Sequence, residues 1–307
     1  VRAVARAPVR HRRRMGRSLT DELRVQQDAL LGWAAPRLRE FVWRSTRDPW
    51  AVLVSEVMLQ QTGVGRVIPK WDAFMEAFPS PHACAESSLG DVLRLWQGLG
   101  YPRRARNLHA AAGVIVREHG GVVPDSLESL LALPGVGAYT ARAVLAFAYE
   151  YDVAVVDTNI ARVLARLRGE RLTPKRAQSA ADELLAEGAA WLWNQAFMDL
   201  GATVCRPVPS CADCPWFEFC AWRGEGDDPA VGSAGVSVAQ GRFEGSDRQA
   251  RGRLIKALGE GSVRVSDVPR VMDRPRDVAE RLVTALVNEG LVMLDPLDPL
   301  ETILRLP

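Results

Sequence analysis

The chain has 307 residues, 48% of them hydrophobic, so it can bury a large core and is expected to form roughly two or three domains. Its 39 Lys and Arg nearly balance 37 Asp and Glu, and a net charge of +2 does not by itself indicate a nucleic-acid partner. No apolar run reaches the roughly 18 residues that a membrane span requires, which excludes a helical membrane protein.

The first 18 residues are interpreted as a disordered basic arm. Val1 to Arg17 hold seven Arg and no acidic residue, and they lack the apolar stretch of a secretory signal. Three interpretations stay open: loose DNA contact, a transit peptide, and translation from upstream of a start at Met15.

From Asp21 to about Trp222 the apolar residues recur mostly at helical spacing, as in LESLLAL, ARAVLAFAY and IARVLARL. Pro and Gly separate these segments, so many short helices are expected. The one extended candidate is VAVV at 153–156. The sequence therefore predicts a mainly α fold.

The segment AVLVSEVMLQQTGV predicts a helix that is apolar on nearly every face, with Glu56 in its middle. Because burial disfavours an ionised carboxylate, the pKa of Glu56 should rise toward the range of a general acid. The alternative is a Glu that hydrogen-bonds to a neighbouring helix end. Gln60 shares its face one turn later, and Gln61 and Thr62 could contact a base edge.

The run LPGVGAYTARAVLAF places Gly135-Val136-Gly137 between two helical segments. Glycines let the backbone approach a ligand closely, and free N–H groups at the start of the second helix can hold a DNA phosphate. With the flanking helices and Pro134, this pattern indicates a helix-hairpin-helix motif; a lone GxG would be only a tight turn.

Asp157 follows VAVV and precedes the helix IARVLARL, so its carboxylate should meet free N–H groups and stay ionised. The alternative is an ordinary N-cap, for which Thr158 or Asn159 would also serve. Glu56 and Asp157 together form an acid and an anion of the kind that glycosidic cleavage uses.

Four of the five cysteines have the spacing C-x5-C-x2-C-x5-C and no His nearby: Cys205, Cys211, Cys214 and Cys220. Such clustering indicates a metal site in a reducing cytoplasm rather than secreted disulfides. A zinc ribbon would show two CxxC pairs, so a 4Fe-4S cluster is favoured over zinc.

After Trp222 the composition changes. Residues 224–245 are rich in Gly, Asp, Ser and Ala without periodicity and predict a linker. Two helical patterns, at 247–258 and 276–289, then precede the short apolar runs LVML and TILRL around DPLDP. Residues 246–307 therefore predict a small α+β unit that resembles a winged helix.

The ordered set of SEVMLQQT, WQGLGY, LPGVGAYTA, VDTN and the cysteine quartet resembles the MutY adenine DNA glycosylases. These belong to the helix-hairpin-helix superfamily that includes endonuclease III, and the resemblance covers about Asp21 to Trp222. It implies a six-helix barrel at 51–155 and a discontinuous iron–sulfur cluster domain at 19–50 and 156–223. We expect the short winged-helix-like unit in place of the Nudix-like domain that many members carry.

The resemblance also implies roles for single residues. Glu56 would protonate adenine, Asp157 would stabilise the cationic sugar, and Tyr139 and Asn159 would assist. Adenine-pocket positions correspond to Trp43, Arg44, Leu59 and Gln195, and opposing-base positions to Gln61, Thr62 and Tyr101. Core packing is the alternative for Trp43, Leu59 and Tyr101. Strand-cleaving relatives have a Lys where Tyr139 stands, so a monofunctional enzyme is expected.

The implied partner is double-stranded DNA with adenine opposite 8-oxoguanine or guanine, with the adenine flipped out of the duplex. We expect a monomer in the bacterial cytoplasm, at the nucleoid, with no membrane partner. Two rivals remain: a thymine or uracil mismatch glycosylase on the same scaffold, and a noncatalytic DNA-binding iron–sulfur protein. Glu56 disfavours the first rival, because a pyrimidine leaving group needs no such acid.

Overall fold

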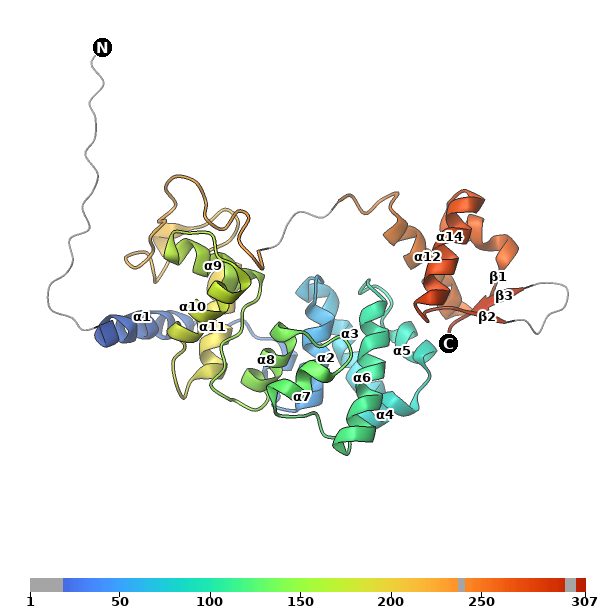
Figure 1. The fold of residues 1–307 in the computed structure, drawn as a ribbon, viewed down its shortest axis with the longest axis horizontal. Helices are drawn as coiled ribbons and strands as arrows, with labels where there is room; N and C mark the ends of the chain where they lie inside the picture. The colour runs from blue at the N-terminus through green and yellow to red at the C-terminus, as the bar shows by residue number, and fades with distance from the viewer. Residues whose placement is uncertain (1–18, 237–240, 296–301) are drawn as a thin grey trace, which may run out of the picture.

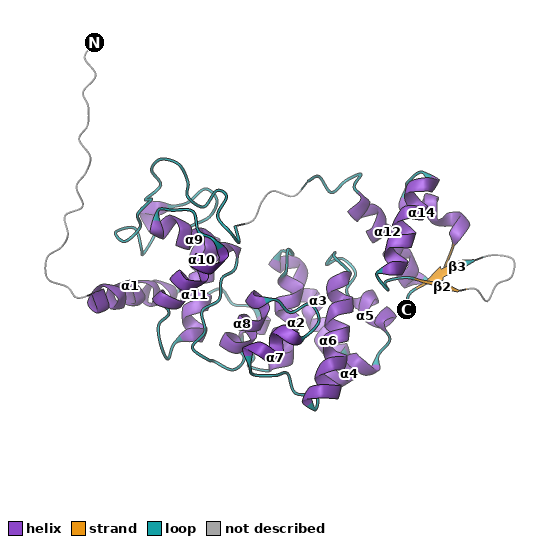
Figure 2. Cartoon of the chain, in the orientation of Figure 1, coloured by secondary structure: helices purple, strands orange, loops and turns teal. Residues whose placement is uncertain are grey.

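The computed structural model describes residues 19–236, 241–295 and 302–307. It is mainly helical, with a small sheet near the C-terminus, which confirms the predicted fold class (Figures 1 and 2). The predicted basic arm at 1–18 lies outside the described residues. Among the helices that are described, none is both long and apolar enough to cross a membrane.

Helix α2 lies at the centre of the larger helical body. It begins after Asp48, whose side chain accepts a hydrogen bond from the Trp50 N–H, and Pro49 is its first residue. Residues 50–58 are all buried, so α2 can only exist inside a ring of other helices. It packs against α3, α6 and α8. The bounds here are α2 (Pro49–Leu59), α3 (Val64–Ala77), α4 (Pro81–Glu86), α5 (Leu89–Leu95), α6 (Arg103–His119), α7 (Leu127–Ala132) and α8 (Ala138–Phe147).

The N-terminal helix α1 (Leu19–Ala34) lies beside helices that come much later in the chain (Figure 1). The Trp216 indole donates to the Gln26 carbonyl at 2.8 Å, and the Gln27 amide donates to the Leu184 and Leu185 carbonyls. Helix α1 packs against α11 (Ala190–Thr203), and α11 packs against α9 (Thr158–Arg168), which also contacts α10 (Pro174–Leu184). Helix α1 and the segment that follows residue 156 thus form one body.

The expected extended segment at 153–156 belongs to no strand. Asn194 of α11 replaces a strand neighbour: its side chain accepts from the Val155 N–H at 3.0 Å and donates to the Val153 carbonyl at 2.9 Å. One amide therefore satisfies the buried backbone of this crossing between the two helical bodies.

Part of the predicted linker packs on the body. Arg166 of α9 forms an ion pair with Asp228 at 2.6 Å, and the buried Ser233 hydroxyl accepts from the Leu172 N–H at 3.1 Å. Residues 228–234 thus contact α9 at Arg166 and the segment after α9 at Leu172.

The C-terminal unit contains α12 (Asp247–Glu260), α13 (Val268–Met272) and α14 (Arg276–Asn288), with 3-10 helix η3 (Val265–Asp267). Its antiparallel sheet has the order β1-β3-β2, with β1 (Val263–Arg264), β2 (Met293–Asp295) and β3 (Ile303–Arg305). The predicted helices and the ribbon from LVML and TILRL are confirmed, whereas α13 and β1 were not predicted. Figure 1 shows this unit beside α5 and α6.

Candidate active site

Glu56 is a buried carboxyl in the centre of α2, only 4% exposed. The Tyr139 hydroxyl of α8 donates to its Oε2 at 2.7 Å. Burial raises the pKa of Glu56 to about 7, although the Tyr139 hydrogen bond opposes the rise. The side chain is therefore suited to give up a proton near neutral pH, as expected of a general acid.

Asp157 is the N-cap of α9. Its carboxylate accepts from the Ile160 N–H at 2.7 Å and from the Asn159 side-chain amide at 2.8 Å. Burial raises the pKa of Asp157 above its ordinary value, and these hydrogen bonds oppose that rise. The sequence predicted the helix-end N–H groups but not how strongly the site is shielded from water.

Glu56, Tyr139 and Asp157 form one electrostatic group. The negative charge of Asp157 raises the pKa of both Glu56 and Tyr139, while the positive charge of Arg44 lowers the pKa of both. Burial is the largest cause of the rise for each. The structure thus brings two carboxyl groups whose pKa values are raised by burial, from elements about one hundred residues apart, into one shielded site.

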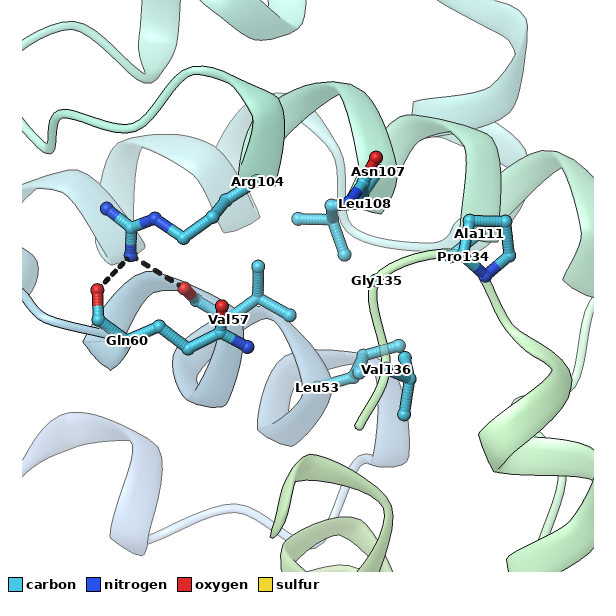
Figure 3. A pocket seen from close by; sticks show the side chains of 10 residues that line it. All are labelled: Leu53, Val57, Gln60, Arg104, Asn107, Leu108, Ala111, Pro134, Gly135 and Val136. Atoms are coloured by element: carbon cyan, nitrogen blue, oxygen red, sulfur yellow. Dashed lines mark hydrogen bonds between the residues drawn. The ribbon is translucent and has the colours of Figure 1, made fainter. Parts of the chain in front are cut away.

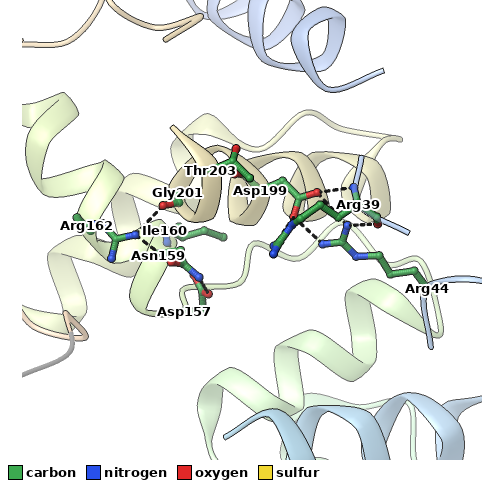
Figure 4. A network of polar contacts seen from close by, with 9 residues as sticks. All are labelled: Arg39, Arg44, Asp157, Asn159, Ile160, Arg162, Asp199, Gly201 and Thr203. Atoms are coloured by element: carbon green, nitrogen blue, oxygen red, sulfur yellow. Dashed lines mark hydrogen bonds and ion pairs between the residues drawn. The ribbon is translucent and has the colours of Figure 1, made fainter. Parts of the chain in front are cut away.

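A chain of hydrogen bonds supports Asp157 from behind, shown in Figure 4. Arg162 donates to the Asn159 side-chain oxygen at 2.9 Å, to the Gly201 carbonyl at 2.7 Å and to the Cys205 carbonyl at 2.7 Å. Asn159 in turn donates to Asp157. The orientation of the carboxylate is therefore connected to the start of the cysteine loop.

Arg44 is held by a buried carboxylate. Asp199 of α11 is 1% exposed and pairs with Arg44 at 2.9 Å and with Arg39 at 2.6 Å. Burial alone would raise the pKa of Asp199, but hydrogen bonds from the two arginines outweigh it and keep that pKa low. Arg44 ends 3-10 helix η1 (Val42–Arg44), so Asp199 fixes this segment beside the site (Figure 4).

Trp43 and Gln195 are part of the packed interior. The Trp43 ring stacks on Phe41, with centroids 5.2 Å apart, and meets Trp71 edge-on at 6.4 Å. Gln195 is buried in α11 and is 5% exposed. Leu59, the last residue of α2, packs against the core. Contact of these three with a base stays a prediction.

Two loops with unusual backbones lie side by side at the end of α2. Gln61 and Tyr101 are both non-glycine residues with positive φ, 54° and 49°. The Thr62 hydroxyl donates to the Leu99 carbonyl at 3.1 Å, which ties the loops together. Left-handed conformations at such residues persist only where the surroundings enforce them.

Arg104 holds both loops in place through hydrogen bonds. Its buried guanidinium donates to the Gln60 carbonyl at 2.7 Å, to the Thr62 hydroxyl at 2.9 Å and to the Gly100 carbonyl at 3.0 Å. Burial lowers the pKa of Arg104 to about 10. One side chain thereby joins the loop that carries Gln61 to the loop that carries Tyr101.

The predicted hairpin is the turn between α7 and α8. Gly135 has φ +77°, and a Cβ there would lie 2.6 Å from the Cβ of Asn107, so the position requires glycine. Val136 is buried and anchors the turn, and Gly137 is the N-cap of α8. Figure 3 shows the small pocket beside it, which Gln60 and Arg104 also line; Glu56 and Asp157 do not.

All four clustered cysteines line one cavity, together with Arg166 and Trp222. Arg166 donates to the Cys205 Sγ at 3.4 Å, and the Arg223 N–H donates to the Cys220 Sγ at 3.4 Å. In the described part of the chain, no group of three or more His, Cys, Asp or Glu side chains is placed so that it could hold a metal ion. Cys84 is buried elsewhere, in α4.

Four residues around the site were missed by sequence reasoning: Arg104, Arg162, Asp199 and Gly201. A Cβ on Gly201 would lie 2.7 Å from the Asn159 Cβ and 2.9 Å from its carbonyl oxygen. The absence of a side chain at Gly201 therefore lets α11 approach α9 closely at Asn159. Arg162 and Asp199 occupy buried positions of helical patterns, and a charge at such a position is the one signal that could have marked them.

Comparison with known proteins agrees with this geometry. Residues 54–187 match the family described as HhH-GPD superfamily base excision DNA repair protein. The chain is 42% identical over 287 residues to an adenine DNA glycosylase of Mycobacterium tuberculosis, which covers 90% of this chain and 92% of that protein. Human adenine DNA glycosylase is 39% identical over 66% of this chain and 40% of its own length.

Solved structures share the fold. A thermostable thymine-DNA glycosylase superposes with a TM-score of 0.64 at 29% identity, over 67% of this chain and 98% of that one. An endonuclease III in a covalent DNA complex gives 0.60 at 22% identity, over 68% and 98%. On its sequence relationships over nearly the whole chain, the protein belongs to the adenine DNA glycosylase family of helix-hairpin-helix base-excision repair enzymes.

Proposed function

We propose that the enzyme hydrolyses the N-glycosidic bond of adenine mispaired with 8-oxoguanine or guanine in double-stranded DNA. The observation that carries this proposal is Glu56, buried, hydrogen-bonded to Tyr139 and with a pKa of about 7. A purine leaves far more easily once a ring nitrogen is protonated, so a proton donor at this place favours adenine.

In the proposed reaction the flipped adenine accepts the Glu56 proton on a ring nitrogen. The bond between sugar and base then breaks, and adenine leaves with its electron pair. Asp157 stabilises the cationic sugar, with its orientation fixed by Asn159 and the Ile160 N–H. Water adds to the anomeric carbon and releases a proton, which restores Glu56.

We infer that the enzyme is monofunctional. Tyr139 is hydrogen-bonded to Glu56, and its pKa lies well above 10 because of burial, so it is not a nucleophile at neutral pH. A Schiff base requires an amine at the anomeric carbon, and this position offers a phenol. Strand breakage should therefore need added alkali.

We propose that Cys205, Cys211, Cys214 and Cys220 hold a 4Fe-4S cluster. The four cysteines line one cavity, and the Sγ atoms of Cys205 and Cys220 accept hydrogen bonds from Arg166 and from the Arg223 N–H. A bound cluster would cross-link this loop and supply no step of base release. We further propose that the protein is a monomer. Its parts are a discontinuous cluster domain at 19–50 and 156–223, a helical barrel at 51–155, a linker at 224–245 and a C-terminal unit at 246–307.

Contacts to DNA follow from the same arrangement. Gly135, Val136 and Gly137 would present backbone N–H groups to a phosphate, and Gln61, Thr62 and Tyr101 would face the opposing base. Trp43, Arg44, Leu59 and Gln195 would surround the flipped adenine. Support comes from the hairpin turn and from the paired loops that Arg104 joins.

The test is single-turnover base release from duplexes with adenine opposite 8-oxoguanine, adenine opposite guanine, and thymine or uracil opposite guanine. Adenine release that Glu56→Gln abolishes, with DNA binding retained, supports the proposal. Glu76→Gln, an exposed change in α3, is the matched control. Release of adenine at the wild-type rate by Glu56→Gln would overturn the assigned role.

The thymine-DNA glycosylase structure makes pyrimidine release the second candidate. It predicts release of thymine or uracil opposite guanine that survives Glu56→Gln, because only Asp157 would then be needed. The same four duplexes separate the two functions.

A further inference from the structure

The C-terminal unit is docked on the barrel helices through a buried carboxylate, Glu289, which follows α14. Glu289 pairs with Arg251 of α12 at 2.5 Å and with Arg103, the first residue of α6, at 2.8 Å. Arg106 of α6 also donates to the Glu289 backbone carbonyl. One residue therefore connects a helix of the C-terminal unit to a helix of the barrel.

Further contacts make this docking specific. Arg94 of α5 donates to the Gly259 carbonyl at 3.3 Å, and the Gly90 N–H donates to the Pro307 carbonyl at 2.7 Å. A Cβ on Gly90 would lie 2.7 Å from the same oxygen, so the backbones are in direct contact. Burial alone would raise the pKa of Glu289, yet hydrogen bonds from Arg251 and Arg103 lower it to about 2. The ion pair is thus intact at any physiological pH.

The docking brings Arg248 to Tyr101. Arg248 lies one turn before Arg251 on α12, and its guanidinium donates to the Tyr101 hydroxyl at 3.2 Å. Below the ring, the Arg104 guanidinium lies 5.6 Å from its centroid. Tyr101 is 37% exposed and has φ +49°. Its partly exposed ring is therefore attached to a left-handed backbone conformation that persists only where the surroundings enforce it.

The charges of the C-terminal unit argue against independent DNA binding. Residues 246–307 contain ten basic and ten acidic residues, so the unit has no net charge. Several of its arginines pair with acids of the same unit, among them Arg253 with Asp273 and Arg281 with Asp247. A module that binds DNA by itself would present an excess of positive charge.

We propose that the C-terminal unit is a positioning element for Tyr101: Glu289 docks it on α6, and Arg248 then holds the Tyr101 hydroxyl so that the ring is preset to enter DNA. This rests on the proposed function, in which Tyr101 contacts the DNA at the opposing base. Fixing the ring beforehand lowers the ordering cost on binding, so the gain appears in DNA binding and base release.

The first test needs no activity. Amide hydrogen exchange over residues 98–104 is measured without DNA in wild type, in Glu289→Gln and in Glu280→Gln, a matched change on α14 whose partner Arg276 lies within that helix. Faster exchange in Glu289→Gln alone is expected. Equal exchange in all three proteins would overturn the docking role.

The second test is a double-mutant cycle on the rate of adenine release. Arg248→Ala and Tyr101→Phe should each slow release about tenfold, and the double variant no further, because both remove the same contact. Arg253→Ala, on the same helix and paired with Asp273, is the control and should keep the wild-type rate. Independent, multiplying losses in the double variant would overturn the proposal.

The two tests separate the two ideas. If wild type releases no adenine from any duplex, the proposed function fails, while the exchange experiment still decides whether Glu289 fixes the Tyr101 loop. If wild type is active and exchange at 98–104 does not respond to Glu289→Gln, only the positioning role fails.

Discussion

The Tyr139 hydroxyl donates a hydrogen bond to Glu56 at 2.7 Å, joining the hairpin-following helix α8 to the central helix α2. A hydroxyl that donates to a carboxylate stabilises the ionised form. The bond therefore offsets part of the pKa rise that burial causes and brings Glu56 to about 7. Without it the carboxyl would hold its proton to higher pH.

Tyr139→Phe should move the pH profile of adenine release. In the proposed reaction, release of adenine requires protonated Glu56, so its rate should fall as the pH rises above about 7. Loss of the hydrogen bond raises the Glu56 pKa further, and the alkaline limb should shift to higher pH. Single-turnover rates between pH 5 and about 9 measure this shift. Tyr149→Phe, whose hydroxyl donates to the Val123 carbonyl, is the control; a limb that moves to lower pH would contradict the assignment.

Glu56 should also make the fold less stable at high pH. Its pKa is raised from 4.5 to about 7, so the stability is complete below pH 4.5 and is lost as the pH rises through about 7. The difference corresponds to about 3 kcal/mol at pH 8. Glu56→Gln should therefore raise the free energy of unfolding at pH 8 but change it little at pH 4.5. Denaturant titrations at both pH values check this, and an equal effect at both would show that Glu56 is not shielded from water.

Asp199→Asn should destabilise the fold by about 3 kcal/mol, because it leaves the charge of Arg44 without its carboxylate in a buried place. Urea unfolding measures the change. The exposed Asp91, which pairs with Arg94, supplies the control Asp91→Asn with little effect expected. If the two variants lose the same small stability, Asp199 does not anchor this segment.

Much of the fold and part of the candidate site can be predicted from patterns among neighbouring residues. The pattern around Glu56 is a charge within an apolar helix, and the pattern around Asp157 is an acidic residue directly before a helix; each signal is contained within a few neighbouring residues. The hairpin at Gly135 was marked in the same way. Such features depend on neighbours in the chain and can be predicted from them.

The ion pairs and hydrogen bonds that hold the site residues in place could not be predicted, because the two partners of each contact are distant in the chain. Asp199 meets Arg44 across 155 residues, and Arg251 meets Glu289 across 38. The error at 153–156 has the same origin: the apolar run was compatible with a strand, but Asn194 satisfies its backbone from another helix. Sequence spacing gives no information on which distant residue supplies such a partner.

The contact between Gly201 and Asn159 can be tested by adding a single methyl group to Gly201. Gly201→Ala adds a Cβ 2.7 Å from the Asn159 Cβ and 2.9 Å from its carbonyl oxygen, and the backbone cannot yield as a flexible side chain would. We expect Asn159 to shift and Asp157 to lose its amide partner, with adenine release slowed by at least about tenfold. Ala is otherwise the better helix former, so any loss comes from the contact.

The control is Gly32→Ala in α1, where nothing beyond the neighbouring backbone of the same helix lies within 4 Å of the added Cβ. That change should raise the free energy of unfolding by up to about 1 kcal/mol and leave base release unchanged. DNA binding by Gly201→Ala, measured separately, should stay near wild type, since the hairpin is untouched. If Gly201→Ala releases adenine as fast as Gly32→Ala, then α11 does not set the position of Asn159, and the orientation of Asp157 depends on the α9 backbone alone.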